Sequence, residues 1–131
     1  MVGIPAKILI VEDENLVAKN LQLLLMRMKY QVVAISAYGE NLIALSEEHS
    51  PDIILIDISL RGSIDGIESA RRLHEVLDIP IVFITANSDL ATLERSKAAH
   101  PYGYILKPFD DREIQFMIEM AISRHQADRD H

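Results

Sequence analysis

The stretch Asp52-Ile-Ile-Leu-Ile-Asp57 holds an unbroken run of branched apolar side chains between two aspartates. Such a run, without polar alternation, is typical of a strand that is buried on both faces in a parallel sheet. Four similar runs occur elsewhere: they are Lys7–Val11, Gln31–Ala34, Ile81–Thr85 and Gly103–Lys107. Consecutive runs are far enough apart for one helix between them, as parallel strands require. The sequence therefore predicts a sheet of five parallel strands.

The segments between the strands have the apolar spacing of helices that cover a sheet. Between the first two strands, one helical face is formed by Val17, Leu21, Leu24 and Met28, which Leu16, Leu23 and Leu25 are expected to widen. Strict alternation of strand and helix predicts a doubly wound α/β sandwich, in which five parallel strands lie between two layers of helices.

The beginnings of several helices can also be located. Asp65 is expected to cap the helix after the third strand, and Ser88 or Asp89 a shorter helix over 90–98. The last helix is expected from Asp111 to about Arg124, and the polar residues 125–131 are expected to fray. We thus expect a single domain over residues 1–131 with its core at about 6–125.

Composition excludes several classes of protein. The 131 residues carry 20 acidic and 13 basic side chains, a net charge of −7, and no cysteine. An acidic surface disfavours direct binding of nucleic acid, and the lack of cysteine excludes disulfides, thiolate zinc sites and a cysteine nucleophile. No apolar run approaches the ~18 residues of a membrane span, and the first residues do not form a signal peptide.

Polar side chains gather where four of the strands end. Glu12 and Asp13 follow the first strand, Asp57 ends the third, Thr85 ends the fourth and Lys107 ends the fifth. Because ligands of open parallel sheets bind beyond the carboxyl ends of the strands, we expect these side chains to converge on one rim. Taken alone, Asp13 is equally well explained as a helix cap, Thr85 as a strand end and Lys107 as a solvated lysine.

The combination is more specific than its members. A carboxylate at the end of a buried run is costly, and neighbouring carboxylates resist joint ionisation. A hard divalent cation removes this cost, and Mg²⁺ takes carboxylates together with a carbonyl and waters. The chain has no Gly-rich phosphate-binding turn after its first strand, no G-x-x-x-x-G-K-[ST] loop and no G-x-S-x-G elbow. The residues favour Mg²⁺ and an aspartate nucleophile that accepts a phosphoryl group.

These residues resemble the receiver domain of bacterial and archaeal two-component response regulators, and the resemblance covers residues 6–125. The matching stretches, in the order and spacing of that family, are Ile8-Leu-Ile-Val-Glu-Asp-Glu14, Asp52-Ile-Ile-Leu-Ile-Asp57, Asp65-Gly66, Val82-Phe-Ile-Thr-Ala86 and Tyr104-Ile-Leu-Lys-Pro-Phe109. The resemblance implies a flavodoxin-like three-layer sandwich with strand order 2-1-3-4-5 and a cytoplasmic location. It also implies that the domain is no enzyme beyond its own phosphorylation and dephosphorylation.

The resemblance further implies roles for individual residues. Asp57 would be the phosphorylation site, and its phosphoryl group would come from a sensor histidine kinase or a phosphotransfer protein. Mg²⁺ would be held by Asp13 and Asp57 directly, by Glu12 through water and by the backbone carbonyl of Ser59.

Other residues would carry the response. Lys107, joined to Pro108 by a cis bond, would pair with the phosphoryl group, and Thr85 would turn inward toward it. Tyr104 would then rotate from exposed to buried. This change would reshape the face made by the fourth helix, the fifth strand and the fifth helix, which would bind a downstream protein, a fused output domain or a second copy in a homodimer.

Three features depart from the common family pattern. Glu12 replaces the commoner aspartate and should keep metal binding through a longer arm. The loop after Asp57 lacks the usual proline and is one residue longer, so the family pattern predicts no placement for Arg61–Ile64. Ser59 and Asn87 stand at positions that influence the rate of dephosphorylation.

Two other functions are compatible with parts of this pattern. A receiver that acts by contact alone would need neither metal nor phosphorylation. A phosphohydrolase of the haloacid-dehalogenase type would need a second aspartate two residues after Asp57, where this chain has Ser59. The sequence ends where the domain ends, which fits a stand-alone receiver or one excised from a hybrid kinase or larger regulator.

The remaining residues of note have simple explanations. The five histidines are scattered without a ligand-like pair and are expected at the surface. Met26 and Met28 are expected to fill the core. Phe116 and Met120 lie off the apolar stripe of the last helix, so we expect them at the edge of the core or in an exposed docking patch.

Overall fold

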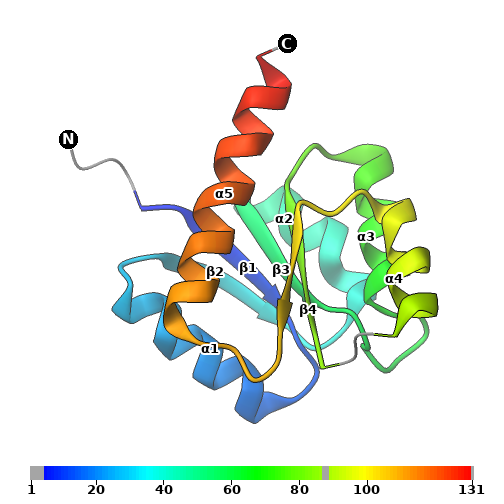
Figure 1. Cartoon of the computed structure of the whole chain (residues 1–131). Coiled ribbons are helices and arrows are strands. Elements are labelled where there is room, and N and C mark those ends of the chain that lie inside the picture. The colour runs from blue at the N-terminus through cyan, green and yellow to red at the C-terminus, as the bar shows by residue number, and fades with distance from the viewer. Residues whose placement is uncertain (1–4, 87–88, 131) are drawn as a thin grey trace.

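The sheet in Figure 1 confirms the predicted fold class. The structure is a computed structural model that describes residues 5–86 and 89–130. Five parallel strands follow one another in the order β2-β1-β3-β4-β5. Their bounds are β1 Lys7–Val11, β2 Gln31–Ser36, β3 Ile53–Asp57, β4 Ile81–Thr85 and β5 Gly103–Leu106. This is the strand order 2-1-3-4-5 of a doubly wound sheet.

Helices cover both faces of the sheet (Figure 1). They are α1 Asn15–Arg27, α2 Leu42–His49, α3 Gly66–Val76, α4 Leu90–Ser96 and α5 Asp111–Arg129, with short 3₁₀ turns η1 at Gly39–Asn41 and η2 at Lys97–Ala99. Helices α1 and α5 pack on one face, whereas α2 and α3 pack on the other together with η2. The fold is therefore a three-layer sandwich.

Alternate residues of each strand point to opposite layers, as the period of two requires. In β1, Ile8 and Ile10 contact the layer of α1 and α5, whereas Leu9 and Val11 contact the layer of α2 and α3. Every residue of β3 is buried. Burial on both sides explains why the strand sequences show no polar alternation.

Helix α1 buries a narrower stripe than its sequence predicts. Leu21 and Leu25 are fully buried, whereas 76% of Leu16 and 50% of Leu23 are exposed, and Met26 is exposed as well. The widening expected from Leu16 and Leu23 and the core position expected for Met26 are therefore wrong, because a helix that lies on a sheet buries only the side facing it. Met28 packs against the core as expected.

Three aspartates cap the N-termini of helices with their side chains. Asp65 accepts a hydrogen bond from the backbone N–H of Glu68, Asp89 from that of Thr92, and Asp110 from that of Glu113. The caps expected at Asp65 and Asp89 are thus confirmed. Ser88, the other candidate for the fourth helix, lies outside the described residues.

Helix α5 extends to Arg129, beyond the end predicted at about Arg124. His125 is buried and its Nε2 lies 2.8 Å from Asp78 Oδ1, while the Tyr102 hydroxyl donates to Asp128 Oδ2 over 2.8 Å. Fraying from residue 125 and a surface position for this histidine were therefore wrong expectations. The contacts involve residues far apart in the sequence, which local polarity does not reveal.

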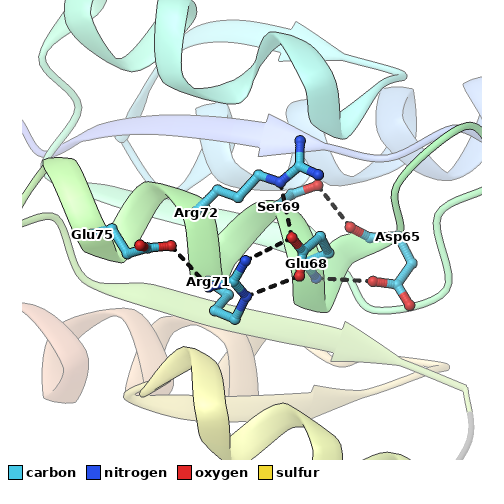
Figure 2. A network of polar contacts seen from close by, with 6 residues as sticks. All are labelled: Asp65, Glu68, Ser69, Arg71, Arg72 and Glu75. Atoms are coloured by element: carbon cyan, nitrogen blue, oxygen red, sulfur yellow. Dashed lines mark hydrogen bonds and ion pairs between the residues drawn. The ribbon is translucent and has the colours of Figure 1, made fainter.

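Ion pairs and hydrogen bonds order the exposed side of α3 (Figure 2). Glu68 accepts hydrogen bonds from Arg71 over 2.8 and 2.9 Å and from Arg72 over 2.9 Å. The two bonds from Arg71, followed by the one from Arg72, lower the pKa of Glu68 to about 2. At the start of the helix, Asp65 also pairs with Arg95 of α4 over 2.7 Å. None of these pairs was predicted from the sequence.

No helix among residues 5–86 and 89–130 is long and apolar enough to cross a membrane.

Gly66, the first residue of α3, lies against the end of β3. A Cβ atom at this position would be 2.1 Å from the backbone oxygen of Asp57, a distance that side chains do not adopt. The absence of a side chain therefore lets α3 begin beside the last residue of β3.

We expect Gly66→Ala to lower the free energy of unfolding by about 1–3 kcal/mol, because the added methyl group meets backbone that cannot move aside. Alanine favours helix over glycine by up to about 1 kcal/mol, which is too little to offset this clash. Urea unfolding measures the change. Ser63→Ala, at an exposed position in the loop before α3, is the control and should have the stability of the wild type. A Gly66→Ala variant as stable as the wild type would contradict this account.

Candidate functional site

Three carboxylates meet at the carboxyl end of the sheet. Asp57 is the last residue of β3, Glu12 and Asp13 directly follow β1, and oxygens of all three lie within 4.8 Å of one another. Glu12 and Asp57 are buried. Backbone hydrogen bonds hold this edge in place, since the Glu12 N–H donates to Ser36 O and the Ile58 N–H to Ile84 O, each over 2.9 Å. The predicted convergence of these carboxylates is present.

Lys107 brings a positive charge between two of the carboxylates. Its Nζ lies 3.1 Å from Glu12 Oε1 and 3.2 Å from Asp57 Oδ2. The backbone N–H of Lys107 donates to the backbone oxygen of Thr85 over 2.9 Å. The peptide bond between Lys107 and Pro108 is cis, as the resemblance implied. Burial lowers the pKa of Lys107, but Asp57 and Glu12 outweigh it and the net shift is upward. The ammonium therefore stays charged.

The carboxyl group of Glu12 is hard to ionise. Burial is the largest cause, and a hydrogen bond and charge repulsion from Asp57 add to it, so that the pKa rises to about 7. The backbone N–H of Glu14, which donates to Glu12 Oε2 over 3.2 Å, and the ammonium of Lys107 act in the opposite direction. These two contacts lower the pKa of Glu12 by less than burial and Asp57 raise it, so the net shift is upward.

Asp13 has a different partner. Its Oδ2 accepts two hydrogen bonds of 3.0 Å, one from the backbone N–H of Arg61 and one from Arg61 Nε. Burial raises the pKa of Asp13, but these bonds and the charge of Arg61 lower it by more, so the net shift is downward. The role of Arg61 is not apparent from the sequence, because this residue lies in the loop for which the family pattern predicts no placement.

Ser59 lies beside the carboxylate of Asp57 and lines a pocket with it. Its backbone N–H donates to Asp57 Oδ1 over 2.9 Å, which orients the carboxylate of Asp57. The pocket has a volume of about 370 Å³, and it is lined by Asp13, Glu14, Asp57, Ser59, Arg61, Ala86 and Lys107. A cavity of this size accommodates a hydrated cation and a small anionic group.

Thr85 and Tyr104 line a second, adjacent cavity. Thr85 is buried at the end of β4 and borders a largely apolar pocket of about 280 Å³ together with Ile58, Leu93 and Tyr104. Tyr104 is half-buried, and its hydroxyl shares a hydrogen bond with Ser96 Oγ of α4. The structure thus places Thr85 beside Tyr104. Asn87, the other residue named for dephosphorylation, lies outside the described residues.

The acidic cluster has the chemistry of a site for a hard cation. Within the described residues, Glu12, Asp13 and Asp57 form the one group of acidic or histidine side chains that could share an ion. Carboxylate oxygens suit Mg²⁺, which also keeps several waters in an octahedral arrangement. The donor set therefore fits the expected cation.

Comparison with known proteins gives a consistent result. A family model for the response regulator receiver domain matches residues 8–119. The transcriptional regulatory protein PdtaR of Mycobacterium tuberculosis is 33% identical over 122 residues, which are 93% of this chain and 59% of PdtaR. The chain thus spans little more than half the length of this curated relative.

Solved structures are similar over nearly the whole chain. The signal receiver domain of a modulated diguanylate cyclase from Desulfovibrio desulfuricans has a TM-score of 0.90 and 37% identity, covering 95% of this chain and 99% of that one. The N-terminal domain of a response regulator/sensory box/GGDEF protein from Carboxydothermus hydrogenoformans has a TM-score of 0.85 and 32% identity, covering 93% and 98%.

The raised pKa of Glu12 predicts a pH-dependent stability. The pKa of Glu12 is about 7 in the folded chain, against 4.5 for an ordinary glutamate in the unfolded chain. Between these two pH values the folded chain therefore binds more protons than the unfolded chain. Its stability should therefore fall as pH rises from 5 to 8, by on the order of 1–3 kcal/mol. Glu12→Gln cannot ionise and should lose this decline.

Urea unfolding in chelator at pH 5, 6, 7 and 8 measures the difference between the two proteins. Glu14→Gln, which changes the exposed neighbouring glutamate, is the control and should keep the decline of the wild type. If Glu12→Gln and the wild type had the same pH profile, Glu12 would not be the group responsible.

Proposed function

This chain belongs to the response regulator receiver domain family, and from that membership we propose that Asp57 accepts a phosphoryl group in an Mg²⁺-dependent reaction. Receiver domains are signalling domains of two-component systems rather than classical enzymes. The proposed donor is a phosphohistidine on a sensor histidine kinase or a phosphotransfer protein. The single observation that supports this proposal best is the carboxylate of Asp57, buried between a lysine and two further acids.

The surroundings of Asp57 suit attack by its carboxylate on phosphorus. A carboxylate oxygen forms the new bond to phosphorus, the bond from phosphorus to the imidazole nitrogen breaks, and the imidazole leaves with that electron pair. The Ser59 N–H, 2.9 Å from Asp57 Oδ1, orients the nucleophile. Lys107 Nζ, 3.2 Å from Asp57 Oδ2, provides positive charge near the transferred oxygens.

Glu12, Asp13 and Asp57, with the carbonyl of Ser59, are the proposed holders of Mg²⁺. When bound, the ion supplies positive charge to the phosphoryl oxygens.

The response would begin at Thr85. We propose that its hydroxyl turns toward the phosphoryl group, and that Tyr104 moves into the adjacent apolar cavity. Tyr104 shares a hydrogen bond with Ser96, so its movement acts directly on α4. The exposed apolar residues on the face of α4, β5 and α5 are Leu90, Leu93, Leu106, Phe116 and Met120. Phe116 and Met120 are thus exposed, and an altered protein-binding face is the proposed output.

The proposal extends to partners and organisation. We propose a single domain over residues 1–131 that acts in the cytoplasm on a downstream protein, on a fused output domain or through a homodimer. Direct binding of nucleic acid by this chain is not part of the proposal, because its net charge is −7. Turnover of external phosphoesters is also not part of it, since Ser59 cannot act as the general acid of a phosphohydrolase.

Asp57→Asn should abolish phosphorylation by a small phosphodonor such as acetyl phosphate in the presence of Mg²⁺, because an amide is not a nucleophile for this reaction. Intact-mass spectrometry detects the added phosphoryl group. Asp52→Asn, at the exposed start of the same strand region, is the matched control and should be phosphorylated like the wild type. Phosphorylation of Asp57→Asn, or a wild type that responds to no donor, would contradict the proposal.

Mg²⁺ at ten times its dissociation constant should raise the free energy of unfolding of the wild type by about 1.4 kcal/mol, because only the folded chain presents the site. Urea unfolding with and without Mg²⁺ measures this gain. Asp13→Asn should lose most of it, whereas Asp111→Asn, on the exposed first turn of α5, should retain it. A wild type indifferent to Mg²⁺ would refute the assignment of the metal.

A further inference from the structure

We propose that Arg61 is the resident counter-ion of Asp13 and that Mg²⁺ must displace its guanidinium group to bind. This inference rests on the proposed metal site and adds to it a residue that sets the affinity. The observation that carries it is the pair of 3.0 Å hydrogen bonds that Asp13 Oδ2 accepts from the backbone N–H and the Nε of Arg61.

The two hydrogen bonds occupy one of the two oxygens of the carboxylate that would ligate the cation. Asp13 is largely covered, and Arg61 lies at the mouth of the same pocket, with 79% of its side chain exposed. A divalent cation bound to the carboxylate of Asp13 would lie within several ångströms of the guanidinium group. Positive charges at such a separation repel each other, so both cannot be held by this carboxylate at full strength.

The positive charges of the pocket differ in their freedom to move. Lys107 contacts Glu12 and Asp57, and only 18% of its side chain is exposed. Arg61 pairs with Asp13, and most of its side chain is in water. A long exposed side chain can leave its partner and become hydrated at little cost. Arg61 is therefore the cation that gives way to Mg²⁺.

The main chain around Arg61 also allows a change. The next residue, Gly62, has a φ of 123°, a conformation that glycine adopts readily. The loop has no proline between Asp57 and Gly66 to restrict it. Leu60, directly before Arg61, is buried in the core, so a change would be confined to the side chain of Arg61 and the residues after it.

Removing the guanidinium group should strengthen Mg²⁺ binding. Exposed ion pairs contribute little, so the competition corresponds to about a two- to fivefold effect on affinity. We expect Arg61→Ala and Arg61→Gln to lower the dissociation constant for Mg²⁺ by this factor, whereas Arg61→Lys, which keeps the charge, should remain close to the wild type. A purely structural role for Arg61 would weaken binding in the neutral variants.

Isothermal titration calorimetry with MgCl₂ at fixed ionic strength measures the dissociation constants of the full chain and its variants. Arg95→Ala is the matched control, because Arg95 makes a similar exposed ion pair over 2.7 Å, but with Asp65, which is not a proposed ligand. It should bind Mg²⁺ like the wild type. Equal or weaker binding by both Arg61→Ala and Arg61→Gln would overturn the inference while leaving the proposed metal site intact.

Nuclear magnetic resonance gives a second test on the unaltered protein. Saturation with Mg²⁺ should shift the Nε–H resonance of Arg61 toward that of a hydrated guanidinium group. If amide resonances at Asp13 and Asp57 move while the Nε–H of Arg61 does not, Arg61 keeps its partner and the inference is wrong. If no resonance in the pocket responds to Mg²⁺, the proposed metal site fails, and this inference fails with it.

Discussion

The repulsion among three carboxylates at the end of the sheet is the constraint on which the rest of this site depends. Oxygens of Glu12, Asp13 and Asp57 lie within 4.8 Å of one another, and Glu12 and Asp57 are buried. Lys107 and Arg61 provide two positive charges against them. The pKa of Glu12 nevertheless rises to about 7, so these charges do not fully offset burial and repulsion. The pocket is arranged to gain from further positive charge.

The same strands that hold the acids connect them to the surface. Thr85 ends β4, and its backbone oxygen accepts the hydrogen bond of Lys107. On its other side, Thr85 borders the cavity that Tyr104 also lines, and Tyr104 shares a hydrogen bond with Ser96 of α4. Few contacts therefore separate the charged pocket from an exposed helix.

The features that the sequence predicted correctly are those that depend on local patterns. The unbroken apolar run Ile53–Asp57 predicts a strand buried on both faces, and Asp65 predicts the N-terminal cap of a helix. The convergence of Asp57 and Lys107 follows from one topological rule about parallel strands. Such inferences need no knowledge of which particular side chains meet.

The features that the sequence did not reveal arise from contacts between distant segments. His125 is buried because Asp78 is close to it, and nothing in the polar sequence around it indicates this. Leu16 is apolar and helical in spacing, yet it faces away from the sheet. The pairing of Arg61 with Asp13 depends on the path of a loop that has no regular pattern. Periodicity predicts elements, whereas these contacts depend on their arrangement in space.

The pairing of Arg61 with Asp13 also separates two tasks within the site. The acids stand at the ends of buried strands, where the core fixes their positions. Arg61 stands in an exposed loop, where a substitution has little effect on packing. A loop residue can therefore add or remove positive charge beside Asp13 while the acids stay in place. In this arrangement the strands fix the positions of the acids, and the loop sets the positive charge next to Asp13.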